Sequence, residues 1–320
     1  MSIKAFTYST CPDGLLQLLT GHLPFSLPLL RRLQYTKYSH GITPTARIIF
    51  VSDTGEVSGG FPRPERFTAC YVDVGSDHNT QMWLYSTLED QDQVGADDDK
   101  FYEQQLRALV DEIIHIAKDY GRELVYSDAV LIGTLHSSVR NILERTGRVT
   151  GRKTGLYDKW LFKVEDIPDS GSPLPEGIYW DEATLADCKL AISRSDIPRT
   201  AEWLSLMPSL ILKLEDGTPI SWAFLGPDGS LASLHCEEGY RRKGLAKTLA
   251  AKLFRERTSE YGDDGWCSAD VSPSNEGSRG MCRRLNGKPY WTLSWVLLNV
   301  RESVNGALTR GADDSQVYFD

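Results

Sequence analysis

A short run of cations followed by a glycine stands between two regular patterns in the segment Leu231–Arg255. The segment opens with an apolar run typical of a strand, passes through RRKG at Arg241–Gly244, and continues with apolar residues at helical spacing. The first amides of a helix have no intrahelical acceptor, and the helix dipole adds partial positive charge at the same end. Glycine also lets the backbone approach a ligand closely. The pattern is therefore typical of a phosphate-binding turn, and the simpler alternative is a surface helix with a solvated basic first turn.

The second half of the chain supplies the elements that must position this turn. Apolar periodicity and turn residues predict an order in which strands precede the helix and two further elements follow it. We expect helices at 180–191 and 200–206, strands at 210–215, 219–225 and 230–237, a helix at 244–257, a strand at 265–271, a helix at 275–285 and a last strand within 289–298.

The first half follows a similar plan without a glycine turn. We expect two short helices within 15–36, strands at 47–53, 67–75 and 81–86, a helix at 99–120, a strand at 124–127, a helix at 136–145 and a strand at 158–164. Acidic residues, Asp97–Asp99, stand where the second half has its cations, and their charge would repel a phosphate. The predicted domains are 1–165 and 178–300, with a Pro-rich linker at 166–177 and a polar tail at 301–320.

Composition excludes several classes of function. A formal net charge of −9 argues against a nucleic-acid partner. The 6 cysteines and 6 histidines are dispersed without metal-ligand spacing, so we expect no metal and a reducing compartment. No apolar run is long enough to span a membrane, and the N-terminus lacks the apolar core of a signal peptide, so we expect a cytoplasmic protein. The GxxxxGK[ST] and GxGxxG nucleotide motifs are missing.

The turn and its surroundings resemble the GNAT superfamily of acyl-CoA-dependent N-acyltransferases. Arg241-x-x-Gly244-x-Ala246 fits the superfamily's (Arg/Gln)-x-x-Gly-x-(Gly/Ala) signature, and the run Asn275–Gly287 resembles its later helix. The sequence PISWAFLGPDGSLASLHCEEGYRRKGLA is similar to the glycine N-acyltransferase-like branch in particular. The resemblance is clearest over 178–300 and is architectural over the first half.

This resemblance implies an α/β (α+β) fold of tandem GNAT-like domains. Each domain would hold a mixed, mostly antiparallel twisted sheet flanked by helices, and only the C-terminal one would keep an intact acyl-CoA motif. It implies that the turn amides wrap the coenzyme A pyrophosphate and that the preceding strand hydrogen-bonds the pantetheine arm. Asn275 is expected to bond backbone or that arm, with a helix cap as the alternative. The implied acyl-CoA-binding residues are Leu234, His235, Cys236, Arg241, Arg242, Lys243, Gly244, Leu245, Ala246, Lys247, Asn275 and Ser278.

The sequence departs from the superfamily where the general base is often a glutamate. Ser230 holds that position, and a hydroxyl cannot serve as a base unaided. The candidates for the base are His235, whose intrinsic pKa suits the task, Glu237 and Glu238. Asp228, acting through a water, is a further possibility. A structural strand histidine and solvated glutamates are the simpler interpretations of the same residues.

A second departure concerns the tyrosine that often protonates the leaving thiolate. Cys282 holds the matching position. A thiol can donate a proton near neutral pH if its pKa is tuned, and the alternative is a small apolar filler beside Met281.

The resulting hypothesis is an acyl-CoA N-acyltransferase of the EC 2.3.1 type. It would move an acetyl or other short acyl group from acetyl-CoA, or another acyl-CoA, to a primary amine by direct attack. The alternative is a non-catalytic coenzyme A-binding or scaffold protein with a retired active site. We expect an unknown amine acceptor as the second partner, no membrane or nucleic acid, and a monomer or homodimer.

Overall fold

The computed structural model describes residues 3–54, 61–77, 79–150, 155–169, 173–195 and 197–301, so 170–172 of the predicted linker and 302–320 of the predicted tail lie outside the described residues. The chain divides into two compact units. Of the described residues, the first contains those up to Gly155 together with those from Leu293 to Arg301, and the second contains those from Leu156 to Thr292.

The first unit is a sheet with helices on both faces. Its strands follow the order β1-β2-β3-β4-β5-β13, and β6 also pairs with β13. The elements are β1 Lys4–Tyr8, α1 Asp13–Thr20, α2 Leu27–Gln34, η1 Tyr35–Lys37, β2 Ala46–Ser52, β3 Phe67–Asp73, β4 Met82–Ser86, η2 Thr87–Asp90, α3 Ala96–Tyr120, β5 Ala129–His136, α4 Ser137–Arg145, β6 Val149–Thr150 and β13 Lys288–Asn299.

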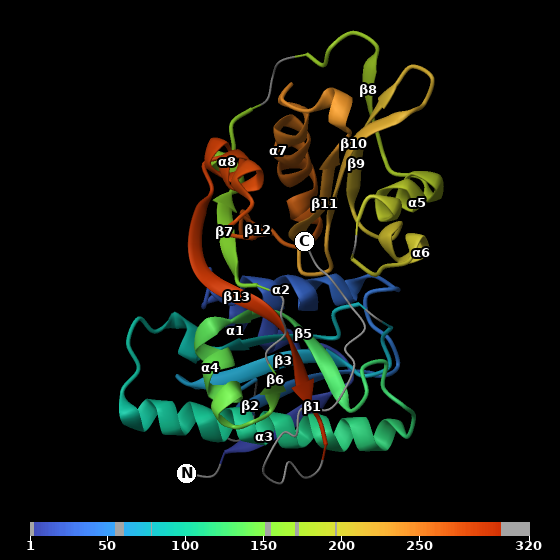
Figure 1. The fold of residues 1–320 in the computed structure, drawn as a ribbon. Coiled ribbons are helices and arrows are strands. Elements are labelled where there is room, and N and C mark those ends of the chain that lie inside the picture. The colour runs from blue at the N-terminus through green and yellow to red at the C-terminus, as the bar shows by residue number, and fades with distance from the viewer. Residues whose placement is uncertain are drawn as a thin grey trace. The chain divides into compact units, whose positions relative to one another are not determined.

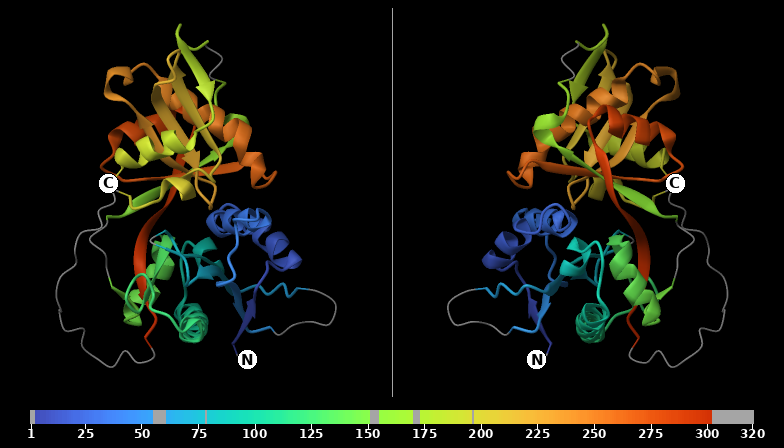
Figure 2. Two further views of the ribbon diagram at one scale, coloured as in Figure 1. Left: turned by 90° about the vertical axis from the view of Figure 1, so that its right-hand side faces the viewer. Right: turned by 90° about the vertical axis from the view of Figure 1, so that its left-hand side faces the viewer.

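Alternation along the strands of this unit divides its core into two layers. In β2, Ile49 and Val51 belong to the apolar cluster that contains α3 and α4. Ile48 and Phe50 belong to the cluster that contains α1 and α2. Because successive side chains of a strand point to opposite faces, one buried strand supports both layers. Figures 1 and 2 show α2 and α3 on opposite sides of these strands.

The second unit carries the predicted turn. Its strands follow the order β7-β12-β11-β10-β9-β8. The elements are β7 Tyr157–Lys163, η3 Val164–Asp166, β8 Ile178–Asp181, α5 Leu185–Ser193, α6 Ala201–Leu204, β9 Ser209–Leu214, β10 Pro219–Leu225, β11 Ser230–Cys236, η4 Glu238–Tyr240, α7 Leu245–Arg257, η5 Thr258–Glu260, β12 Trp266–Val271 and α8 Glu276–Arg284.

Two strands pair differently from the sequence-based expectation. The strand expected at 158–164 in the first domain is β7, which pairs antiparallel with β12 of the second unit. The last strand of the second half, β13, pairs from Leu293 to Asn299 with β5 of the first unit. Each half of the sequence therefore supplies a strand to the other unit, and the division of the chain differs from the predicted domains 1–165 and 178–300. Strand pairing is a long-range property that local periodicity does not encode.

One strand of the first half was placed wrongly. The strand expected at 124–127 begins at Ala129 instead and runs to His136. Residues Tyr126 and Ala129 form an isolated bridge with Asp128 at a φ of 54° between them, so the backbone turns where the strand was expected. The helix expected at 180–191 begins only at Leu185, because Ile178–Asp181 form the strand β8. The strands β1, β6 and β8 were not expected from the sequence. The other expected helices and strands lie at or near their predicted positions.

Both units share one topological feature that bears on the site. Most strand pairs are antiparallel, and among the described residues the parallel pairs are β4 with β5 and β11 with β12. In each case a helix, α3 or α7, connects the two parallel strands. The units are thus two copies of one mixed, mostly antiparallel plan, as the sequence predicts.

Gly287, which connects α8 to β13, should tolerate no side chain. A Cβ at this position would overlap the buried ring of Phe162 in β7. We expect Gly287→Ala to lower the free energy of unfolding by about 1–3 kcal/mol, because a packed core cannot accept the added volume without strain. Urea unfolding would measure this change.

The matched control is Gly280→Ala in α8, where no atom lies within 4 Å of the added Cβ. Alanine should stabilise that helix by about 0.5–1 kcal/mol. Equal unfolding midpoints for the two variants would contradict the packing argument at Gly287.

Candidate functional site

The ladder between β11 and β12 ends after its first two pairs. Ser230 pairs with Ser268 and Leu231 with Ala269, and the register extends no further although both strands continue. Beyond Leu231 the described edge of β11 that faces β12 is therefore open. Its amides and carbonyls, spaced as in a strand, can hydrogen-bond an extended ligand that bears amide groups.

A bulge in β11 explains why the two strands separate. Against β10, the register shifts between Trp222 and Phe224, and Ser233 on the opposite strand has a φ of 50°. A bulge adds one residue to a strand, bends it and increases its local twist. The bend turns the second half of β11 away from β12, and this produces the opening.

The predicted turn follows directly after the open edge. A single turn of 3-10 helix, η4, leads to Arg241, whose Nε donates to the carbonyl of Cys236 at 2.9 Å. Arg242 and Gly244 both have left-handed backbone, with φ of 63° and 82°, and α7 begins at Leu245. Left-handed residues at a helix start make a concave cluster of amides that suits an anion.

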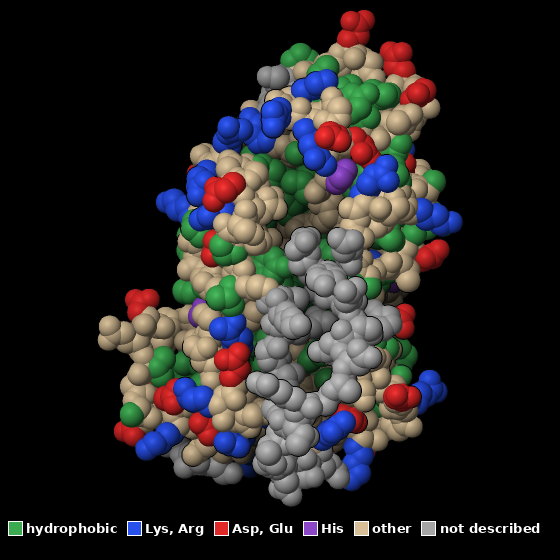
Figure 3. Space-filling view, viewed as in Figure 1, with side chains coloured by type: hydrophobic (Ala, Val, Ile, Leu, Met, Phe, Trp, Pro, Cys, Tyr) green, Lys and Arg blue, Asp and Glu red, His purple; other side chains and the backbone are tan. Residues whose placement is uncertain are grey.

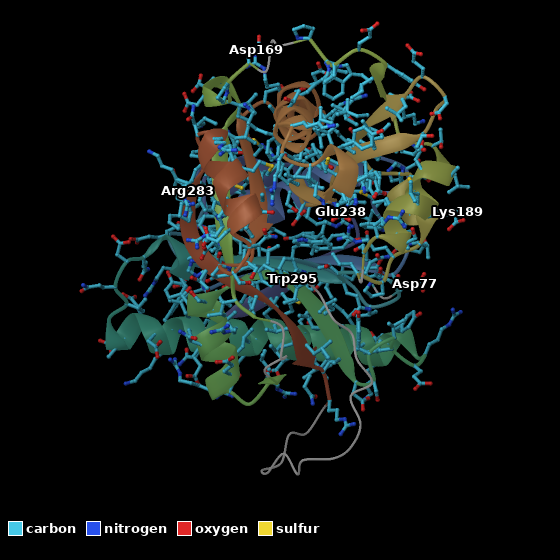
Figure 4. The ribbon with its side chains drawn as sticks, turned by 45° about the horizontal axis from the view of Figure 1, so that its top comes forward. Asp77, Asp169, Lys189, Glu238, Arg283 and Trp295 are labelled. Carbon is cyan, nitrogen blue, oxygen red and sulfur yellow. The ribbon has the colours of Figure 1, made fainter. Side chains whose placement is uncertain are left out.

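The cations of the turn are exposed, and α7 holds the turn in place. Arg242 and Lys243 lie at the surface, while Leu249 and Leu253 of α7 are fully buried. Figure 3 shows Lys and Arg side chains gathered on this unit, beside a depression with hydrophobic side chains on its floor. In Figure 4, Glu238 lies just before α7 and Arg283 lies on α8. The turn therefore presents positive charge at the surface, and the buried side of α7 fixes its position.

His235 lies beyond the bulge in a partly buried position. Its ring stacks on the buried Trp222 with centroids 4.6 Å apart, and its Nε2 is 3.7 Å from Oε2 of Glu237. Burial lowers the pKa of His235, and the nearby Arg241 and Arg194 also lower it, whereas Glu237 opposes the shift. The imidazole is therefore neutral at pH 7 and can accept a proton.

The other predicted side chains take structural positions. Oε1 of Glu237 accepts from Nε of Arg194 at 3.1 Å, which ties this carboxylate to the end of α5. Oδ1 of Asn275 accepts from the amide of Ser278 at 3.0 Å, so Asn275 caps α8, which was the alternative interpretation of that residue.

Cys282 is wholly buried. Its relative exposure is 0%, and burial raises the pKa of its thiol to about 12. This placement matches the apolar-filler interpretation. A thiol enclosed in the core cannot meet a leaving group at the surface.

Ser230, at the position expected for a glutamate, is bonded to a carboxylate. Oδ1 of Asp228 accepts from Oγ of Ser230 at 2.6 Å and from its amide at 3.2 Å. Asp228 is itself buried in the turn between β10 and β11. The hydroxyl at the end of the β11–β12 ladder is therefore connected to an acidic group that could take up a proton.

A buried ion pair lies beside this carboxylate and was missed from the sequence. Lys159 of β7 stands directly opposite Asp270 of β12, with Nζ 2.5 Å from Oδ1. Burial raises the pKa of Asp270, Lys159 opposes the shift, and Asp228 adds to it. The signal was present in both strands: a charged residue occupies an interior position of YDKWLFK and of WCSADV.

These charges lie on the face of the sheet opposite α7. Phe162 of β7 contacts Phe254 of α7, so the alternating position Lys159 faces the other way. Across the β7–β12 and β11–β12 ladders, Asp270 and Ser230 share that second face. One face of the opening thus carries the helix with the phosphate turn, and the other carries acidic and basic side chains.

The first unit holds a different chemistry at the equivalent place. Only Met82 and Ile132 pair between β4 and β5 among the described residues. Glu89 of η2 is buried there, burial raises its pKa, and α3 starts with Asp97–Asp99. Acidic groups at this helix start oppose anion binding, in agreement with the sequence. In neither unit do the described residues form a group that could hold a metal ion.

The two halves of the sequence match two different protein-family models. Residues 2–160 match the family model of the acyl-CoA N-acyltransferase verG N-terminal domain, and residues 211–296 match that of FR47-like proteins. Together they support the GNAT superfamily of acyl-CoA N-acyltransferases. The first match relates the N-terminal half to an acyl-CoA N-acyltransferase family by sequence, where the motifs of that half predict only a similar architecture. No match singles out the glycine N-acyltransferase-like branch, and no curated protein matches the chain.

Solved structures show the same fold over both units. A Drosophila protein from a structural genomics programme aligns with a TM-score of 0.63 at 16% identity, covering 89% of this chain and 95% of that one. A tandem GNAT protein from the clavulanic acid biosynthesis pathway aligns with a TM-score of 0.54 at 11% identity, covering 94% and 100%. The chain therefore has a tandem GNAT-like fold. No described helix is both long and apolar enough to cross a membrane.

The buried ion pair generates a prediction about stability. Lys159→Met should lower the free energy of unfolding by roughly 3–5 kcal/mol, because Asp270 is left charged and unpaired in the core. Adding Asp270→Asn to this variant should recover much of the loss. Chemical unfolding of the single and double variants would measure both effects.

Lys163→Met provides the control for the lost lysine. Lys163 lies on the same strand and face but is partly exposed, with Nζ 3.8 Å from the centre of the Trp266 ring. Its loss should cost no more than about 1 kcal/mol. A Lys159→Met cost as small as the control's would contradict the assignment of a buried pair.

Proposed function

We propose that the second unit binds an acyl-CoA and transfers its acyl group to a primary amine. The observation that carries this proposal is the open β11 edge leading straight into the turn at Arg241–Gly244. Coenzyme A joins an amide-bearing arm to a pyrophosphate. The open edge suits the arm, and the amides of the turn suit the pyrophosphate.

The binding roles proposed for individual residues follow from this geometry. Leu234, His235 and Cys236 supply the backbone that pairs with the pantetheine arm. The amides from Arg242 to Lys247 surround the pyrophosphate, and the exposed cations of the turn attract the phosphates. Asn275 and Ser278 contribute through the start of α8, which their mutual hydrogen bond fixes.

The reaction we propose is direct attack without a covalent enzyme intermediate. The amine nitrogen bonds to the thioester carbonyl carbon, the carbon–sulfur bond breaks, and the coenzyme A thiolate leaves. A backbone amide at the bulge near Ser233 supports this step by stabilising the developing oxyanion. His235, neutral at pH 7, takes the ammonium proton, and the Ser230–Asp228 pair is the second route for it.

The finer assignments extend this proposal. We favour acetyl or another short acyl group, and a relationship to the glycine N-acyltransferase-like branch rests on the sequence from Pro219 to Ala246. We expect the enzyme to act in the cytoplasm as a monomer or homodimer, without a metal. The named N-acyltransferase activity of the verG family agrees with this chemistry.

One specific observation favours a second candidate, a coenzyme A-binding protein that has lost catalysis. Cys282 is buried at the position expected for the acid, and Ser230 replaces the expected glutamate. Release of free thiol from acetyl-CoA in the presence of a panel of amines distinguishes the two. Coenzyme A binding without amine-dependent thiol release would favour the non-catalytic candidate.

Gly244→Asp should weaken coenzyme A binding at least about tenfold, because it places a carboxylate and a strained left-handed residue at the phosphate turn. Isothermal titration calorimetry would measure the affinity. Gly239→Asp in η4 is the matched control, since it adds the same charge nearby, where no atom lies within 4 Å of the new Cβ. Similar affinities for the two variants would remove the support for a phosphate site at Gly244.

The pH dependence of turnover tests whether His235 is the general base. Because the pKa of His235 is lowered from 6.5, the imidazole becomes protonated only below that pH. We therefore expect kcat/KM to fall as the pH decreases through a value below 6.5. His235→Gln should remove this limb and reduce kcat/KM by about 10²–10⁴-fold.

His115→Gln, at an exposed histidine of α3, should leave the profile unchanged. If His235→Gln keeps the acidic limb while Ser230→Ala loses activity, the proton passes through Ser230 and Asp228 instead.

A further inference from the structure

The two ring nitrogens of His235 have different surroundings. Nε2 is buried without a hydrogen-bond partner at normal distance, and Oε2 of Glu237 lies 3.7 Å from it. No described hydrogen bond reaches Nδ1, and Nδ1 is not one of the buried unpaired polar atoms, so it is open to solvent. A neutral imidazole carries its proton on one nitrogen and accepts at the other. The contact with Glu237 therefore bears on which nitrogen is the acceptor.

The imidazole and the carboxylate are each held from a second side. The ring of His235 stacks on the buried Trp222 at an interplanar angle of 16°, and the carbonyl of His235 accepts from Oγ of Ser221 at 2.6 Å. Oε1 of Glu237 accepts at 3.1 Å from Nε of Arg194, the residue that ends α5. One carboxylate oxygen thus meets the arginine and the other faces the imidazole. Because a carboxylate can only accept, its contact with Nε2 requires a proton on that nitrogen.

The charged groups that act on His235 come from three segments. Glu237 directly follows β11, Arg241 belongs to the phosphate turn, and Arg194 lies at the end of α5. Burial lowers the pKa of the imidazole most, Glu237 raises it, and the two arginines lower it further. The ring is therefore neutral before the reaction, and Glu237 is the group among these three that stabilises the ring once it gains a proton.

We propose that Glu237 and Arg194 are positioning residues, which place the proton of the neutral His235 ring on Nε2 and leave Nδ1 as the acceptor. The ammonium proton of the acyl acceptor then bonds to Nδ1, and the amine nitrogen keeps the electron pair for its attack on the thioester. The ring becomes an imidazolium whose Nε2–H is directed at the carboxylate, which stabilises the new charge. This inference rests on the proposed acyl transfer, in which His235 is the base.

Glu237→Gln tests the placement of the proton with little change in shape. Arg194 can only donate, so it should hold the amide oxygen and turn the amide NH2 group toward Nε2. Nε2 must then accept, and the ring proton moves to Nδ1, where the ring can no longer take up another. We expect kcat/KM to fall roughly 10–100-fold. The KM for acetyl-CoA and the unfolding midpoint should stay unchanged, because a half-exposed ion pair contributes little to stability.

Removal of Arg194 should rescue this variant. In the double variant Arg194→Ala, Glu237→Gln, the amide is free to rotate and to present its oxygen to Nε2. We therefore expect kcat/KM to rise at least about threefold above that of Glu237→Gln alone. An ion pair with only a structural role predicts no such gain, since the second loss would add to the first or change nothing. A double variant no more active than Glu237→Gln would overturn the proposal.

Arg194→Ala alone should move the acidic limb of the kcat/KM profile to higher pH. Loss of a nearby cation favours the imidazolium, so the pKa of His235 rises and the base becomes protonated at a higher pH. An unchanged limb would contradict the coupling of Arg194 to the base.

Two exposed residues provide controls for the changes in charge. Lys189 lies on α5, as Figure 4 shows, and Glu215 follows β9. Lys189→Gln and Glu215→Gln remove the same charges as Arg194→Ala and Glu237→Gln, and neither residue has a described contact with His235. Both control variants should keep the kcat/KM and the pH profile of the unmodified protein.

Nitrogen NMR of the ring keeps failure of this inference distinct from failure of the proposed function. Long-range proton–nitrogen spectra of the protein labelled with 15N-histidine distinguish the two tautomers, and His235→Gln assigns the signals. We expect the Nε2–H form in the unmodified protein and the Nδ1–H form in Glu237→Gln. A proton on Nδ1 in the unmodified protein refutes the proposal even if an amine is acylated. If the expected tautomers are found and no amine reacts, acyl transfer fails while the placement of the proton by Glu237 stands.

Discussion

The binding site proposed in the second unit depends on the hydrogen-bond ladder between β11 and β12, which ends while both strands continue. Two pairs join β11 to β12, and then the bulge at Ser233 bends one strand away from the other. A strand edge without a partner exposes donors and acceptors, which in most folds invites unwanted pairing. Here the open edge is short and lies inside a sheet, so an extended ligand can reach it while another strand is kept out by the strands on either side. A turn of this kind alone could bind any anion. The open edge beside it adds selectivity for a ligand that also carries an extended, amide-bearing arm.

The charged side chains on the sheet face opposite α7 are buried, and burying a charge costs free energy unless an opposite charge compensates it. Lys159 and Asp270 are nearly inaccessible to water, and Asp228 is buried beside them. Isolated charges would be expelled from such a site or neutralised. Lys159 and Asp270 compensate each other, with Nζ 2.5 Å from Oδ1. An ion pair of this kind can be buried where a single charge cannot.

Local chemistry explains what the sequence could predict. The turn, α7 and α8 were found because glycine, successive cations and helical apolar spacing all lie within a few residues of one another. The exchange of β7 and β13 was missed because a strand's own residues do not say which distant edge it joins. Cys282 was assigned by position within a motif, and position carries no information about burial.

The strand exchange also connects the first unit, whose described helix α3 starts with acidic residues, to the second half of the sequence. Leu293 and Val296 of β13 are buried in pairs with β5, so the last strand of the second half belongs to the core of the first. Conversely, β7 follows the first half in sequence and carries Lys159, the partner of Asp270. Removing the first half would leave β13 without its neighbour β5, and starting the chain after β7 would leave Asp270 buried without Lys159. The first unit therefore depends on the second half of the sequence for a strand of its sheet, whatever ligand it does or does not bind.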